Sequence, residues 1–155
     1  MSRSSERLSW DELFYGIAHL SSKRSEDPHT KVGACLVKDK HVIGIGYNGA
    51  PRGFSGSFDW MTPEKYDYVI HAEMNAIANA CAIGAQCSGA DIYLTLSPCH
   101  DCMKLIVQHQ IKRVFFKDRY KDFDLTLKIA SACGVKLKEL VLDDEGKIKD
   151  IRAMN

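Results

Sequence analysis

Long apolar runs are missing from this 155-residue sequence. No stretch approaches the roughly 20 apolar residues that cross a membrane, and the opening MSRSSER has no apolar signal core. An excess of one charge is missing too, because 21 Lys and Arg face 20 Asp and Glu. A net charge of +1 provides no broad attraction for nucleic acid or an anionic membrane. We therefore expect a cytoplasmic protein with no nucleic-acid or membrane partner.

A disulfide framework and a disorder-prone composition are also missing. Six cysteines in a reducing compartment are expected to stay reduced and to serve as core residues or metal ligands. Apolar residues make up 45% of the chain and charged residues 26%, which is ordinary for a folded protein. We expect one domain over residues 1–155, with a tail from about residue 143 that is a solvated end or a short helix.

Helical and strand patterns alternate along the chain. Ser9 and Glu12 have the spacing of a capping box before an apolar helical face, which predicts a helix over 9–25. The remaining patterns predict helices over 71–83, 98–109 and 123–133 and strands over 32–38, 41–46, 91–97, 113–118 and 135–141. The first two strands form a hairpin, whereas strands joined by helices run parallel. The sequence therefore predicts an α/β protein, a three-layer α/β/α sandwich with a mixed five-stranded sheet.

Residues 47–68 predict a long loop rich in Gly, Pro, Ser and aromatic residues. It exceeds the usual length of a connection between elements. Loops of this length commonly serve a binding site or an interface.

Residues suited to metal binding lie at two predicted helix starts. Cys99 and Cys102 form a Cys-x-x-Cys, a spacing that occurs in redox dithiols, structural zinc sites and catalytic zinc sites. A structural site needs four protein ligands, and the other cysteines form no second pair. His71 provides a third ligand, which leaves one position of a tetrahedral zinc open. Alone, a histidine at a helix start is more often an ordinary hydrogen-bonded residue, so the zinc hypothesis depends on the combination.

Glu73 lies two residues after His71 and completes the combination. Side chains two apart on a helix point about 200° around its axis, so Glu73 can act at the open side of the ion rather than chelate it. His-x-Glu with Pro-Cys-x-x-Cys is the signature of zinc deaminases, and it reads HAE at 71–73 and PCHDC at 98–102. Glu73 would then move protons as a general base and acid. The alternative is a glutamate that only stabilises the helix N-terminus.

A wider set of motifs resembles one family of these enzymes. The motifs are DPHTKVGACLV (27–37), GIGYNGAPRG (44–53), IHAEMNAIANA (70–80), TLSPCHDCMKLI (95–106) and KDRY (117–120). They are similar to those of deoxycytidylate (dCMP) deaminases, whose phage-encoded members match this chain in size. GYNGAPRG is the motif that points to dCMP deaminases in particular, because the zinc motif alone is shared with cytidine, guanine and tRNA adenosine deaminases. The resemblance implies a cytidine-deaminase-like fold and the zinc-dependent hydrolysis of dCMP to dUMP and ammonia for dTTP synthesis.

The resemblance also implies contacts to the substrate. Arg119 and Tyr120 match a basic residue and a tyrosine that close on the phosphate and the base, and a guanidinium suits phosphate oxygens. Asn48 resembles an asparagine that contacts the sugar hydroxyl. A solvated arginine and an Asn-Gly turn are the alternatives for these positions. The other implied substrate contacts adjoin the zinc motif and are Ala72, Ser97 and Pro98.

Regulation and assembly are implied in the same way. The resemblance implies a homohexamer that is activated by dCTP and inhibited by dTTP, with Mg²⁺ bound to the triphosphate. A phage-encoded member would work in the host cytoplasm. The expected effector contacts are GYNG and nearby basic residues, namely Arg24, Lys31, Gly46, Tyr47, Asn48, Gly49 and Arg52. Asn48 is therefore assigned to two sites.

Two further points concern the number of zinc ions and the alternative functions. Some family members hold a second, structural zinc in the loop after GYNG, but residues 50–69 contain neither His nor Cys, so we expect one zinc per chain. A deaminase of cytidine, deoxycytidine or dCTP, a tRNA adenosine deaminase, and a non-catalytic nucleotide sensor on the same fold stay open as alternatives.

Overall fold

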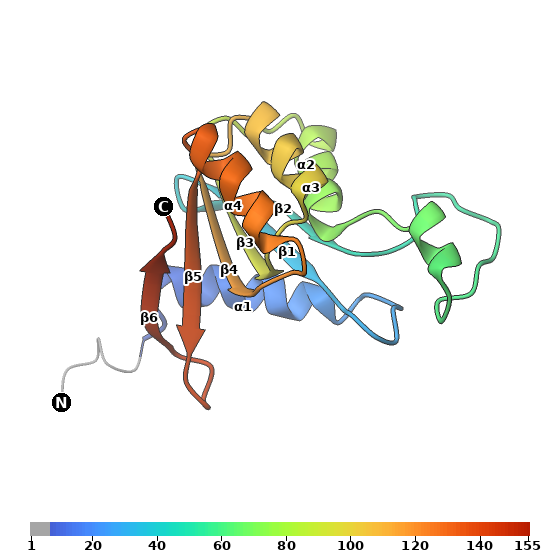
Figure 1. Ribbon diagram of the computed structural model, residues 1–155, viewed down its shortest axis with the longest axis horizontal. Coiled ribbons are helices and arrows are strands. Elements are labelled where there is room, and N and C mark those ends of the chain that lie inside the picture. Colours follow the sequence, from blue (N-terminus) through green and yellow to red (C-terminus); the bar gives the residue numbers. More distant parts are fainter. Residues whose placement is uncertain (1–6) are drawn as a thin grey trace.

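A computed structural model describes residues 7–155 and contains one six-stranded sheet between two helical layers (Figure 1). The opening MSRSSE, most of the stretch in which no signal core is found, lies outside the described residues. The strands are β1 (Gly33–Lys38), β2 (His41–Tyr47), β3 (Asp91–Leu96), β4 (Arg113–Asp118), β5 (Lys136–Leu142) and β6 (Ile148–Ala153). The helices are α1 (Trp10–Ser22), α2 (Ala72–Ala82), α3 (His100–Gln108), α4 (Phe123–Ala132) and the 3₁₀ helix η2 (Pro63–Asp67).

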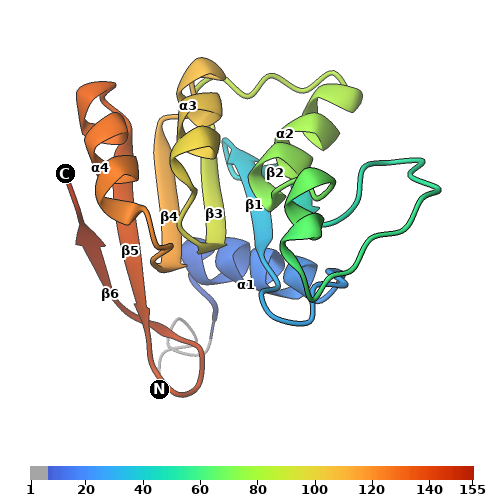
Figure 2. The ribbon, with the colours of Figure 1, turned by 45° about the vertical axis from the view of Figure 1, so that its right-hand side comes forward.

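The two faces of the sheet bury separate cores because side chains alternate along each strand. On β3, Ile92 and Leu94 join the core under α2, α3 and α4, whereas Tyr93 between them joins the core under α1. Figure 2 shows α1 apart from α2, α3 and α4. The predicted mixed α/β sandwich is confirmed. No helix in this part of the chain is both long and apolar enough to cross a membrane.

The strand order is β2-β1-β3-β4-β5-β6. β1 and β2 form the predicted antiparallel hairpin, whose two turn residues Asp39 and Lys40 have φ values of 50° and 62°. β3, β4 and β5 run parallel, as expected for strands joined by helices. Their carboxyl ends therefore lie at one edge of the sheet, where α/β proteins commonly bind ligands.

The prediction of five strands was wrong, because the tail forms β6. β6 pairs antiparallel with β5, and the Ile148 amide donates to Glu12 Oε2 at 3.0 Å. Glu12 also completes the predicted capping box with Ser9 at the start of α1. The tail is thus not a helix but an edge strand, with most of its side chains exposed to solvent. β5 lies just before β6 in the sequence, but the exposed, charged residues of β6 lack the apolar alternation that predicted the other strands, and its second partner, Glu12, is distant.

Two glycines of β2 let α2 approach the sheet closely. A Cβ at Gly46 would lie 2.4 Å from the backbone oxygen of Ala72 and 2.4 Å from the backbone nitrogen of Ala76, and Gly44 has a similar clash with α2. These distances are far below van der Waals contact. β2 therefore determines where the first turn of α2 can lie.

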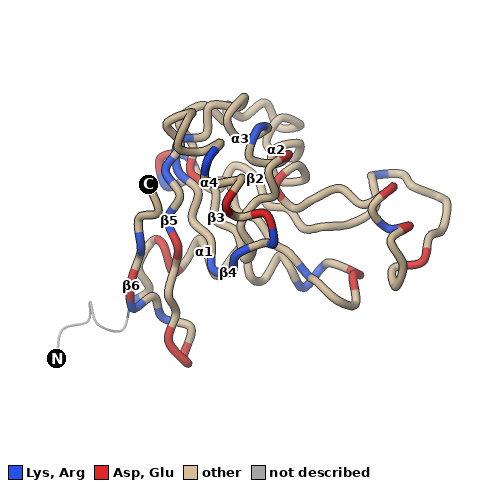
Figure 3. The backbone as a smooth tube through the Cα atoms, viewed as in Figure 1, with Lys and Arg blue, Asp and Glu red and all other residues tan. Residues whose placement is uncertain are grey.

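The long loop extends away from the sheet and carries η2 (Figure 1). Its aromatic side chains pack on one another, with Phe58 between Phe54, Trp60 and Tyr68 at centroid distances of 4.8–5.7 Å. Basic and acidic residues are interspersed over both the loop and the sheet (Figure 3).

Candidate active site

His71, Cys99 and Cys102 come together where α2 and α3 begin. His71 is the N-cap residue of α2, and Cys99 is the N-cap residue of α3. His71 Nδ1 lies 3.5 Å from Cys99 Sγ and 3.4 Å from Cys102 Sγ. Within the described residues, this is the only group of three His, Cys, Asp or Glu side chains close enough to hold a metal ion.

The spacing of these atoms fits zinc. Zinc binds sulfur at about 2.3 Å and nitrogen at about 2.0 Å with tetrahedral angles, so nitrogen and sulfur ligands of one ion lie about 3.5 Å apart. The observed separations of 3.4 and 3.5 Å agree with this value. Three protein ligands leave one tetrahedral position for water or substrate, as in catalytic zinc sites. The cluster is therefore suited to a catalytic Zn²⁺ ion.

The electrostatics of the two cysteines also suit a cation between them. The hydrogen bond from the Cys102 thiol lowers the pKa of Cys99 to about 4, with burial opposing it and His71 assisting. The same contact, together with burial and the nearby Glu73 carboxylate, raises the pKa of Cys102. One thiolate thus disfavours the second, whereas a dication between them stabilises both.

Glu73 lies in the first turn of α2 and is only 3% exposed. Burial raises its pKa to about 7, although the nearby His71 lowers it. A carboxyl group with this pKa can both accept and release a proton near neutral pH, as a proton shuttle must. Its position next to His71 places it beside the metal cluster.

Contacts from α4 support the segment that presents Cys99. The Thr126 hydroxyl donates to the Pro98 carbonyl at 2.8 Å. Asp122 Oδ2 accepts from the His100 amide at 3.0 Å and contacts His100 Nδ1 at 2.7 Å. These contacts hold the residues on both sides of Cys99, so the thiol position is set by α4 as well as by α3.

A cavity of about 100 Å³ opens beside the cluster. Of the predicted substrate contacts, Asn48, Ala72, Ser97 and Tyr120 line it together with His71, Glu73 and Cys99. Ser97 Oγ accepts from the Tyr120 amide at 2.7 Å, which joins the carboxyl ends of β3 and β4. Pro98 is buried next to the cavity without lining it.

Asn48 belongs to this cavity, although the sequence assigned it to two sites. Its Oδ1 accepts from the Val32 amide at 2.8 Å, and its Nδ2 donates to the Thr30 carbonyl at 2.9 Å. Thr30 and Val32 line the same cavity. Asn48 is therefore held firmly at the cavity wall by the segment that leads into β1.

Arg119 lies outside this cavity. Its guanidinium forms a bidentate ion pair with Glu139 of β5, at 2.9 and 3.0 Å, and sits over the Phe123 ring. The arginine side chain is 50% exposed. The structure thus places the predicted phosphate contact against β5 rather than beside the cluster.

Some of the expected effector contacts gather at a second hollow of about 540 Å³. Arg24, Tyr47 and Gly49 line it, and the Arg24 guanidinium lies 5.5 Å from the centre of the Tyr47 ring. Aromatic residues of the long loop form its other side. The remaining expected contacts point elsewhere: Lys31 Nζ donates to the Ser25 carbonyl, Arg52 contacts Asn79, and Gly46 lies under α2.

Sequence reasoning missed the cavity residues that come from two loops. Asp27 and Thr30 belong to the quoted motif DPHTKVGACLV but received no role, and Lys65 and Tyr66 of η2 carried no signal. These residues meet only because the long loop folds back on the segment before β1. No local pattern predicts that contact.

Comparisons with known proteins agree with the geometry. A model of the cytidine and deoxycytidylate deaminase zinc-binding region matches residues 8–118. The deoxycytidylate deaminase of Homo sapiens is 45% identical over 126 residues, which cover 76% of this chain and 70% of that protein. The deoxycytidylate deaminase of Mycobacterium phage D29 is 38% identical over 124 residues, which cover 71% of this chain and 95% of that protein. The solved dCMP deaminase of cyanophage S-TIM5, in complex with dCMP and dUMP, is similar with a TM-score of 0.75 and 28% identity over 90% of this chain and 99% of that chain.

Proposed function

Because the chain belongs to the cytidine and deoxycytidylate deaminase family, we propose that this hydrolytic deaminase converts dCMP to dUMP and ammonia. The observation that carries the proposal is the set of His71, Cys99, Cys102 and Glu73 beside a cavity large enough to admit solvent. Relatives named deoxycytidylate deaminase support dCMP, rather than another cytosine compound, as the substrate of this chain. The product dUMP supplies dTTP synthesis.

The chemistry divides between the metal and the chain. When bound by His71, Cys99 and Cys102, zinc supplies Lewis-acid activation that lowers the pKa of water toward about 7. Glu73 accepts the proton of the attacking water and delivers it to ring N3, which makes C4 more electrophilic. The oxygen of that water bonds to C4, and Glu73 then carries the second proton of the water to the amino group, which leaves as ammonia when its bond to C4 breaks. Its pKa of about 7 suits both directions of transfer.

The cavity residues orient the nucleotide. Tyr120, held by Ser97, offers its ring to the base, and Asn48 offers its amide to the sugar. Ala72 and Ser97 form the wall next to the cluster, and Pro98 supports it through Thr126. Arg119 contacts the 5′-phosphate once its ion pair with Glu139 has broken.

The regulation proposed for this chain follows the family resemblance, with dCTP as activator and dTTP as inhibitor. Arg24 and the aromatic side chains at the second hollow suit a triphosphate and a base, with Mg²⁺ neutralising part of the charge. The working assembly is a homohexamer of single-domain chains in the cytoplasm. Arg24, Tyr47 and Gly49 are the effector contacts that this hollow supports best.

The decisive experiment compares four candidate substrates: dCMP, dCTP, deoxycytidine and a tRNA stem-loop. Purified zinc-loaded protein should release ammonia fastest from dCMP and should not release it from the stem-loop. Preference for deoxycytidine over dCMP would overturn the nucleotide assignment. Adding dCTP and dTTP to the dCMP assay tests regulation, and a rate indifferent to both would contradict it.

A further inference from the structure

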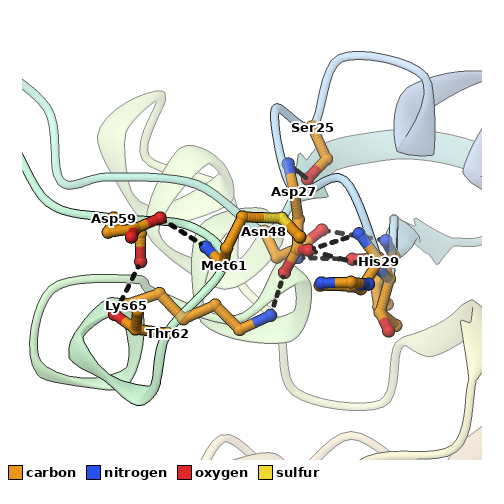
Figure 4. Close-up of polar contacts among 10 residues, drawn as sticks. Ser25, Asp27, His29, Asn48, Asp59, Met61, Thr62 and Lys65 are labelled. Atoms are coloured by element: carbon orange, nitrogen blue, oxygen red, sulfur yellow. Dashed lines mark hydrogen bonds and ion pairs between the residues drawn. The ribbon is translucent and has the colours of Figure 1, made fainter.

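Lys65 of η2 reaches from the long loop into the cavity. Figure 4 shows its side chain extending to Asp27, and Lys65 Nζ lies 2.9 Å from Asp27 Oδ2. Both side chains are nearly buried, with exposed fractions of 11% and 5%. Both residues line the cavity that contains His71 and Glu73.

Asp27 is held in place independently of Lys65. Its Oδ1 accepts from the amide of His29 at 2.8 Å (Figure 4). It also accepts from the amide of Thr30 at 3.2 Å. Thr30 in turn accepts from Asn48 through its carbonyl. A network of fixed backbone contacts therefore positions the carboxylate that holds the Lys65 ammonium.

The same ion pair is the polar side-chain attachment of the loop to the rest of the protein. In the part of the chain that the structure describes, residues 53–69 make no other side-chain hydrogen bond or ion pair to the rest of the protein. The other side-chain contacts of this segment are internal, among them Asp59 with Glu64 and Asp59 with Met61. Lys65 is thus either only an anchor for the loop or also a group that acts in the cavity.

Charge distinguishes the two roles. Lys65 is the only Lys or Arg that lines the cavity among the described residues, whereas Asp27 and Glu73 are acidic. A nucleoside monophosphate carries nearly two negative charges at neutral pH, and such a group needs a cation where it is taken out of water. Arg119 is engaged with Glu139 outside the cavity.

The ammonium of Lys65 also has donors to spare. It has three N–H groups, and Asp27 is the one hydrogen-bond acceptor that it contacts among the described residues. A nearly buried ammonium with unused donors is suited to an anion that arrives in the cavity, because charge-assisted hydrogen bonds are strong where solvent is excluded.

We propose that Lys65 is a specificity-determining residue that binds the 5′-phosphate of the substrate, with Asp27 holding its ammonium in the cavity. The proposal rests on the proposed function. It assigns part of the preference for a nucleotide over a nucleoside to η2 of the long loop, in addition to the contribution proposed for Arg119.

The test compares variants that break the same ion pair in different ways. Lys65→Met removes the cation, and Lys65→Gln removes the charge but keeps a donor for Asp27. Asp27→Asn also breaks the ion pair, yet it keeps the cation and the Oδ1 acceptor of the two amides. Lys65→Arg keeps the charge and serves as the rescue variant. The readouts are kcat/KM for dCMP and for deoxycytidine, and calorimetric affinity for dUMP and for deoxyuridine.

Both charge-removing variants should lower kcat/KM for dCMP about 10- to 100-fold more than for deoxycytidine, and should weaken dUMP binding by a similar factor relative to deoxyuridine. Asp27→Asn and Lys65→Arg should keep most of the preference for the phosphorylated ligands. If Lys65 only anchors the loop, Lys65→Gln and Asp27→Asn will impair both ligands of each pair equally, which overturns the proposal.

The outcome separates this proposal from the function on which it rests. Wild-type protein that fails to act on dCMP contradicts the proposed function. Wild-type protein that prefers dCMP, together with a Lys65→Gln variant that keeps that preference in turnover and in binding, contradicts only the role of Lys65.

Discussion

At the scale of single residues, burial gives the Glu73 carboxyl group the pKa that its proposed role in proton transfer requires. A carboxylate that is 3% exposed loses most of its hydration, which raises its pKa to about 7. In a purely structural role this loss would destabilise α2. Beside His71 and the two cysteines, the same loss gives the carboxyl group the pKa that proton transfer near neutral pH requires.

The first prediction concerns this carboxyl group. Glu73→Gln keeps the size of the side chain and removes its ability to shuttle a proton. Turnover of dCMP should fall by about 100- to 10,000-fold, with the zinc content and the melting temperature close to those of the wild type. Steady-state kinetics, elemental analysis and calorimetry measure the three quantities. Substantial turnover in a zinc-loaded variant would contradict the role of Glu73.

Arg119 carries the second prediction. Arg119→Ala should raise KM for dCMP about tenfold or more while changing KM for deoxycytidine little, because phosphate contacts exist only in the nucleotide complex. The matched control is Glu139→Gln, which releases Arg119 from its ion pair and should not raise KM for dCMP. Equal effects of Arg119→Ala on both substrates would indicate a structural arginine that serves β5 only.

At the scale of elements, the contact of α2 with β2 positions the site. Gly46 leaves room for the first turn of α2, which carries Glu73 and follows His71. A strand residue with a side chain at this position would push the helix start away from the sheet. The position of the metal ligands therefore depends on a strand that supplies no ligand.

The third prediction tests this contact with a pair of glycine substitutions. Gly46→Ala should destabilise the fold by about 1–3 kcal/mol or more and weaken zinc binding, because its Cβ meets the backbone of α2. Gly16→Ala on the exposed side of α1 meets nothing within 4 Å and should stabilise by about 0.5–1 kcal/mol. Chemical denaturation and zinc titration provide the measurements. Unchanged zinc affinity in Gly46→Ala would show that the metal site does not depend on the close approach of α2 to β2.

At the scale of the whole molecule, the fourth prediction is one zinc ion per chain. Elemental analysis should give one, since the described residues contain one suitable cluster and residues 1–6 contain neither His nor Cys. Removal of the ion with a chelator should lower the melting temperature by about 10 °C, because a ligand that binds only the native state stabilises it. A content of two would show that a metal site has been overlooked.

The fifth prediction concerns stability in acid. Burial alone would raise the pKa of Asp27, but the hydrogen bonds from Lys65 and two amides lower it overall. The hydrogen bond from Arg119 lowers the pKa of Glu139. Carboxyls with lowered pKa values contribute stability that is complete above their unfolded values of about 3.9 and 4.3 and is lost as the pH falls through the folded values.

Calorimetry from pH 6 downwards should therefore show a falling melting temperature below about pH 4.5. The double variant Asp27→Asn with Glu139→Gln should start from a lower melting temperature and lose less of it over the same range. A parallel decline in wild type and variant would mean that other groups, among them the metal ligands, determine the acid sensitivity.

Much of the fold and of the metal centre could be predicted because the relevant signals are local. Helix periodicity, capping residues and the spacings of His71-x-Glu73 and Cys99-x-x-Cys102 are properties of short stretches of chain, and the observed elements begin and end within a few residues of the predicted positions. The sixth strand was missed because its own residues carry a weak strand signal. β6 pairs with β5 across a short turn, but five of its six side chains are exposed and its charged residues interrupt the apolar alternation. Its other contact, from Ile148 to Glu12, joins residues 136 apart in the sequence.

The sequence by itself determined the proposed chemistry of this protein: the candidate metal ligands, the candidate proton shuttle and the α-helices and strands up to β5 follow from neighbours in the chain. Only the tertiary structure decided which polar groups share the cavity. It placed Lys65 with Asp27 beside the metal cluster, turned Arg119 toward Glu139, and assigned Asn48 to the cavity rather than to the second hollow. The physical reason is that a charged side chain goes to whichever partner the folded backbone brings within hydrogen-bonding distance, and that distance depends on loops rather than on local propensity.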